Sequence, residues 1–135
     1  MRVSRAPALV IALGFSLAAG AAELDGTVPL TCTATAGHDC DPAKTQCEKL
    51  TPKSKGPIEM RIDFANKTVK TPYRTAELPI QHSATNDEQL IMQGTDLKFA
   101  WSAIVNRKTG ALTLSVADRV GSYVIFGKCR VADGG

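Results

Sequence analysis

The chain has 135 residues, with 16 Lys plus Arg against 13 Asp plus Glu, so its formal net charge is +3. This length suits one small domain. A weak net charge without a basic run argues against a nucleic-acid-binding protein.

The N-terminus has the layout of a secretory signal peptide. Arg2 and Arg5 precede an apolar run over 6–19, and small residues occupy 19–22. This order predicts a signal peptide over 1–21, with cleavage after residue 21 or 22. The apolar run is shorter than the roughly 20 residues that a spanning helix needs, so we expect no membrane insertion after cleavage. Because both arginines are removed, Lys plus Arg falls from 16 to 14 while Asp plus Glu stays at 13, which leaves a net charge of +1.

The four cysteines all lie in the exported part of the chain, at Cys32, Cys40, Cys47 and Cys129. An even number of cysteines in an oxidising compartment predicts disulfides, and we expect a protein of the periplasm or a secreted protein. We favour Cys40–Cys47 as a local staple around a proline-containing loop, with Cys32–Cys129 tying the N-terminal arm to the last strand. The pairing of Cys32 with Cys40 and of Cys47 with Cys129 stays open.

Residues 22–57 are predicted to form an N-terminal arm that belongs to one domain with 58–135. The arm begins with a weak, threonine-rich strand over 27–35, and a polar loop over 36–57 follows. Loops of this length usually have a structural or a binding role. The candidates for partner binding in this loop are His38, Lys49, Lys53 and Lys55. The lysine group of the loop, which also includes Lys44, could meet an acidic partner.

The next segment alternates apolar and polar residues. Residues 58–64 read IEMRIDF, and a period of two predicts a strand with its apolar side chains turned inward. A short strand over 68–71 follows. Residues 77–82 are predicted as another short strand, which Pro79 places at a sheet edge, and 83–87 as a loop.

The C-terminal segment is predicted to be a meander of four strands. Period-two alternation in LKFAWSAIVN places Phe99 and Trp101 on one apolar face, so Trp101 is expected in the core. A nearly continuous apolar run over 123–126 predicts burial on both faces, or a closed sheet. Trp101 and Tyr123 are also the aromatic residues to consider as contacts for a ligand. The expected strands are 88–93, 97–106, 111–117 and 122–131, with turns over 94–96, 107–110 and 118–121.

These elements predict a mostly β chain: a small antiparallel β-sandwich or barrel-like meander with a disulfide-stapled N-terminal arm. We expect it to be a monomer.

Motifs for catalysis are missing. The sequence has no Gly-x-Ser-x-Gly, no Cys-x-x-Cys and no phosphate-binding glycine loop. The cluster over 38–41 has no second group of ligands, so we expect no metal site and no cofactor. The sequence therefore favours a non-enzymatic domain that binds an unknown protein or small molecule. The alternatives are an inhibitor of an exported hydrolase such as lysozyme, with 36–57 as the inserted element, and a small hydrolase using His38 or His82, or a metal-binding protein.

Three short patterns occur in the meander: Gly94-x4-Phe99-x-Trp101, Arg107-x-Thr109-Gly110 and Phe126-Gly127-x-Cys129. In these patterns the chain resembles small exported proteins of Gram-negative bacteria that have no assigned function. The resemblance implies a signal peptide, a cysteine-bearing arm and a meander that ends in Gly-x-Cys, and it implies no catalytic residues. The chain is also similar to periplasmic lysozyme inhibitors, which are small disulfide-bearing β-barrels, but their Ser-Gly-x-x-Tyr loop is missing.

Overall fold

A computed structural model describes residues 24–51, 58–71 and 77–134. The predicted signal peptide over 1–21 and the candidate residues Lys53 and Lys55 lie outside the described residues. Within the described residues, no helix is long and apolar enough to cross a membrane.

All regular elements of the described residues are β-strands, which confirms the predicted mostly β class and its barrel-like meander. The strands are β1 (Leu30–Cys40), β2 (Glu48–Lys49), β3 (Glu59–Asp63), β4 (Thr68–Lys70), β5 (Leu78–Pro79), β6 (His82–Thr85), β7 (Gln89–Asp96), β8 (Phe99–Asn106), β9 (Ala111–Asp118) and β10 (Ser122–Val131).

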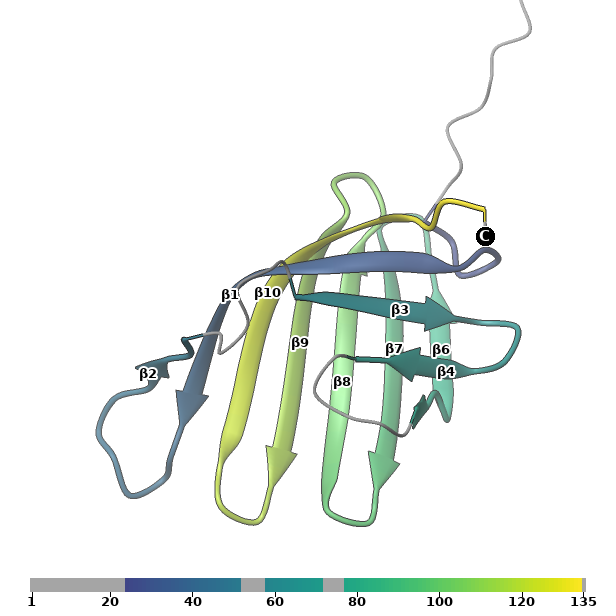
Figure 1. The fold of residues 1–135 in the computed structure, drawn as a ribbon. Coiled ribbons are helices and arrows are strands. Elements are labelled where there is room, and N and C mark those ends of the chain that lie inside the picture. The colour runs from purple at the N-terminus through teal and green to yellow at the C-terminus, as the bar shows by residue number, and fades with distance from the viewer. Residues whose placement is uncertain (1–23, 52–57, 72–76, 135) are drawn as a thin grey trace, which may run out of the picture.

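The strands form one antiparallel sheet that curls into a half-barrel. Its order is β5-β4-β3-β1-β10-β9-β8-β7-β6, with β2 added to β1. Strands β3 and β4 cross in front of β7 and β8, so the sheet folds over itself (Figure 1). The two ends of the sheet meet in one chain segment. Ile80 N donates to the Lys67 carbonyl at 2.8 Å, next to β4, and Gln81 N donates to the Gln93 carbonyl at 2.9 Å, in β7.

The pairing of β1 with β10 joins the two ends of the chain. It runs from Leu30 opposite Val131 to Cys40 opposite Ser122, with a register shift between Ala34 and Ala36. Such a bulge bends a strand, and β1 is visibly bent where it leaves β3 (Figure 1). The first half of β1 therefore pairs with β3, while its second half projects past the core.

Both disulfides agree with the favoured pairing. Cys32 is bonded to Cys129, its directly opposite residue in the β1–β10 ladder, and Cys40 is bonded to Cys47. The predicted staple of the N-terminal arm is confirmed. The Cys32–Cys129 bond is buried in the core, whereas Cys47 is exposed.

The core fills the space between the crossing layers. Trp101 is 6% exposed, so its predicted place in the core is confirmed. Each fully buried aliphatic or aromatic side chain contributes about 1.5–3 kcal/mol through its removal from water. The buried cluster consists of Leu30, Cys32, Met60, Ile62, Val69 and Ile80 from one layer, and Leu90, Met92, Trp101, Ala103, Val105, Leu112 and Cys129 from the strands of the meander and β10.

The predicted loop over 36–57 is wrong at its start. Residues 36–40 belong to β1, and β2 lies further along the same segment. Ala36 and Gly37 have low strand propensity, so no local pattern predicts that the strand continues. The strand continues because the bulge restores its pairing with β10.

The meander differs from its predicted form at three places. Residues 94–96 belong to β7 and not to a turn, so Leu97 lies in the turn and is exposed. Residues 83–85 form part of β6 and not a loop. The run 123–126 is not buried on both faces, because the side of the sheet that carries Phe126 is open to solvent.

Gly94 lies inside β7 because no side chain fits there. A Cβ at this position would be 2.2 Å from the Pro79 carbonyl oxygen and 2.6 Å from Trp101 Nε1.

We expect Gly94→Ala to lower the free energy of unfolding by about 1–3 kcal/mol in a urea titration, because the backbone must move to admit the methyl group. Gly134→Ala is the control, since nothing lies within 4 Å of its Cβ. Equal stability of the two variants would contradict this packing.

The two disulfides differ in the length of chain that they close. Their cysteines are 97 and 7 residues apart in sequence. In the chain-entropy account, replacing Cys32 and Cys129 by alanine costs roughly 4–5 kcal/mol, against less than about 3 kcal/mol for Cys40 and Cys47. Urea unfolding of the two double variants tests this order, and a larger loss for the Cys40/Cys47 pair would reverse it.

Candidate functional site

A disulfide-closed hairpin projects from one end of the sheet. We call residues 39–48 the stapled hairpin; it connects β1 to β2 and is closed by Cys40–Cys47 (Figure 1). Its turn is held by Asp41, whose Oδ1 accepts a hydrogen bond from Ala43 N at 2.8 Å and whose carbonyl accepts one from Lys44 N at 3.0 Å. The hairpin is therefore a fixed projection, although its tip is exposed.

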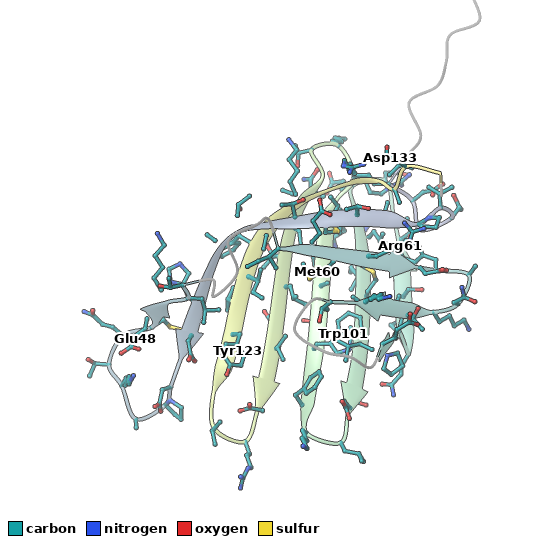
Figure 2. All side chains as sticks on the ribbon, viewed as in Figure 1. Glu48, Met60, Arg61, Trp101, Tyr123 and Asp133 are labelled. Carbon is teal, nitrogen blue, oxygen red and sulfur yellow. A yellow bond between two sulfur atoms is a disulfide. The ribbon has the colours of Figure 1, made fainter. Side chains whose placement is uncertain are left out.

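The register of three strands brings acidic and aromatic side chains together. Asp39 lies opposite Tyr123 of β10 on one side and opposite Glu48 of β2 on the other. Directly opposite residues of an antiparallel pair project from the same face of the sheet. Asp39, Glu48 and Tyr123 therefore share one face. Figure 2 shows Glu48 on the projecting hairpin and Tyr123 on the adjoining part of β10.

A cleft of about 140 Å³ lies between the stapled hairpin and the β9–β10 turn. Four carboxylates and one ammonium group line it, so the cleft is acidic. The lining residues are Asp39, Asp41, Lys44 and Glu48 from the hairpin, and Asp118, Val120, Gly121 and Tyr123 from the turn and β10.

Three of the four carboxylates already have partners. Asp118 Oδ1 accepts from Val120 N at 2.8 Å and from Gly121 N at 3.0 Å. Glu48 Oε1 accepts from Lys44 Nζ at 2.8 Å, and Asp41 closes the hairpin turn. Within the described part of the chain, the Asp39 carboxylate accepts no hydrogen bond. This carboxylate is the one left to meet a ligand.

Lys44 is the cation of the cleft, and its charge is held by its acidic neighbours. The hydrogen bond that Lys44 donates to Glu48 and the negative charge of Glu48 raise the pKa of Lys44, with smaller contributions from the charges of Asp41 and Asp39. The Lys44 side chain is 49% exposed, so water screens this interaction and it adds little to stability. Lys44 donates its hydrogen bond to Glu48, whereas it meets Asp39 only through a weaker charge interaction.

The arrangement suits an organic cation. A carboxylate beside an aromatic ring can bind an ammonium or guanidinium group by charge and by cation–π attraction. No three His, Cys, Asp or Glu side chains of the described residues come together as metal ligands, and Cys40 and Cys47 are bonded to each other. The carboxylates are spread along the cleft rather than gathered around one point.

The structure brings together two of the partner-binding residues that the sequence suggested, while Lys53 and Lys55 lie outside the described residues. His38 lies opposite Lys49, so these two are neighbours. The His38 ring packs edge-on against Phe126, with ring centroids 6.5 Å apart. Because successive residues of a strand alternate, His38 and Lys49 lie on the face opposite to Asp39.

Sequence reasoning missed the acidic cleft, although one signal was available. Asp39 and Glu48 flank the two cysteines on their outer sides, so the predicted Cys40–Cys47 bond implies that the two carboxylates are neighbours. Tyr123 was already a candidate contact. Asp118 gave no local signal, because the long-range pairing of β1 with β10 alone brings it near the hairpin.

Comparison with protein-family models, with curated proteins and with solved structures gave no match.

The raised pKa of Lys44 can be tested by removing its cause. We expect Glu48→Gln to lower the pKa of Lys44 towards its ordinary value, since the charged hydrogen-bond acceptor is lost. The pKa of Lys44 is raised in the folded protein, so the attraction between Lys44 and Glu48 stabilises the fold at pH values below the ordinary lysine pKa. This stabilisation is lost as the pH rises through the raised pKa. NMR titration of the Lys44 side chain measures its pKa in the parent protein and in Glu48→Gln. Asp87→Asn, at the other end of the sheet, is the control; an unchanged pKa in Glu48→Gln would refute the pairing.

Proposed function

We propose that this chain is a non-enzymatic binding domain of the periplasm or the extracellular medium, which recognises a cationic group of its partner in the cleft beside the stapled hairpin. The observation that carries the proposal is the placement of the Asp39 carboxylate, which accepts no hydrogen bond from the described residues, directly opposite Tyr123. The two disulfides are compatible with export to an oxidising compartment.

The cleft is organised before any ligand arrives. The Cys40–Cys47 bond and the turn closed by Asp41 fix the hairpin. A site that is already ordered loses less conformational entropy on binding than a mobile loop does. This rigidity supports a recognition role for the hairpin.

The size of the cleft favours a side chain over a whole small molecule. Its volume of about 140 Å³ is below the roughly 300–1,000 Å³ of typical small-molecule pockets. One lysine or arginine head group is small enough for this volume and carries the positive charge that the carboxylates of the cleft attract. The partner that we propose is therefore a protein that presents a basic side chain.

A second candidate function is inhibition of an exported hydrolase such as lysozyme. The projection of a rigid, disulfide-closed hairpin from the end of the sheet favours it, since such an element can enter the substrate cleft of an enzyme (Figure 1). Residues 39–48, rather than the whole of 36–57, are then the inserted element. Full lysozyme activity in the presence of micromolar protein would exclude this candidate for lysozyme.

The cationic preference is tested with a matched pair of short peptides, one containing arginine and the other its neutral isostere citrulline. We expect NMR titration with the arginine peptide to shift the amides of Asp39 and Tyr123, and the citrulline peptide to shift neither. Asp39→Asn removes the carboxylate charge and should weaken binding roughly tenfold, which corresponds to about 1.4 kcal/mol.

Asp87→Asn is the matched control for this experiment, because it removes the same charge at the far end of the sheet and should bind like the parent protein. Equal binding of the two peptides, or unchanged affinity in Asp39→Asn, would contradict the proposed recognition.

A further inference from the structure

We propose that the outer face of β1, β3 and β4 carries a second binding site, for a tetrahedral oxyanion such as phosphate or a phosphate monoester. It lies on a different part of the sheet from the acidic cleft and has the opposite charge preference. It is therefore independent of the function proposed above.

The strand register places two cations side by side. Thr31 of β1 lies opposite Arg61 of β3, and Arg61 lies opposite Lys70 of β4. The residues next to them along each strand, among them Met60 and Val69, are buried in the core. Since side chains alternate along a strand, Thr31, Arg61 and Lys70 all project outward.

The pairing of Arg61 with Lys70 is unfavourable without an anion. Like charges directly opposite on antiparallel strands repel and reduce stability. In the described ranges, no carboxylate lies within salt-bridge distance of either head group, and both side chains are exposed. An anion placed between them removes the repulsion and gains attraction from both.

A hollow of about 360 Å³ lies beside these cations. The hydroxyls of Thr31 and Thr71 border it and can donate hydrogen bonds to an oxyanion. Arg61 supplies a fork of donors that suits phosphate oxygens, and Lys70 supplies a point charge. Figure 2 shows Arg61 on β3, in the layer that crosses in front of the meander.

Two neighbouring residues limit the charge that the site offers. Arg130 lies opposite Thr31 in the same row, but its guanidinium donates to Asp133 at 2.9 Å. Glu59 borders the hollow with a negative charge of its own and opposes an anion. Arg61 and Lys70 are therefore the cations that hold the ligand, and their two charges match a doubly charged phosphate.

The test uses the mature protein with both disulfides intact, titrated with inorganic phosphate at constant ionic strength against sodium chloride. We expect saturable NMR shifts at the amides of Thr31, Arg61 and Lys70 with phosphate and not with chloride. Shifts that do not saturate, or that chloride reproduces, would overturn the proposal.

Three variants test the roles of the side chains. Arg61→Gln and Lys70→Gln should each weaken phosphate binding about fivefold or more, and Glu59→Gln should tighten it by about two- to fivefold. The control is Lys98→Gln, which removes an exposed lysine from the β7–β8 turn and should change nothing. All four positions are exposed, so the fold should be kept; equal weakening by Lys98→Gln would show a general charge effect and overturn the site.

A sedimentation experiment with lipid vesicles shows whether the phosphate group belongs to a lipid or to a soluble molecule. Sedimentation with vesicles of phosphatidic acid in phosphatidylcholine, lost in Arg61→Gln, would assign a lipid headgroup. Binding of inorganic phosphate without binding to these vesicles would assign a soluble phosphate monoester. Both results support the site, whereas vesicle binding that Arg61→Gln leaves intact would place the contact elsewhere.

Discussion

The pairing of β1 with β10 is the contact on which the rest of this structure depends. It brings the first strand beside the last, across 97 residues between Cys32 and Cys129, and the disulfide locks that register. The bulge between Ala34 and Ala36 then divides β1 into two functional parts. The first half closes the core against β3, and the second half carries the stapled hairpin to the start of β10.

Both candidate sites arise where the backbone register places like charges opposite each other. Asp39 faces Glu48 in the hairpin, and Arg61 faces Lys70 in the covering layer. Such pairs reduce stability and are not needed for the fold, whose core is apolar. In the hairpin, Lys44 reduces the repulsion between Asp39 and Glu48 by pairing with Glu48. A cationic ligand in the acidic cleft would reduce it further, and an anionic ligand beside β3 and β4 would reduce the repulsion between Arg61 and Lys70.

Much of the fold could be read from local patterns, because strands with one buried face alternate strictly. The prediction for 122–131 matches β10, and of the two cysteine pairings that stayed open, the one favoured by the strand assignment is found. The end of β1 was missed because its pairing with β10, and not its own residues, makes it a strand. For the same reason the acidic cleft was only partly predictable. Asp39 and Glu48 become neighbours through a local disulfide, whereas Asp118 joins them only through tertiary structure.

Disulfide mapping of the protein, purified without reductant and digested between its cysteines, tests the central pairing most directly. Our account predicts one cross-linked peptide that joins Cys32 to Cys129 and a second that joins Cys40 to Cys47. A peptide joining Cys47 to Cys129, with Cys32 bonded to Cys40, would contradict it. The first strand would then not be locked to the last in this register, and the cleft beside Tyr123 would lose its basis.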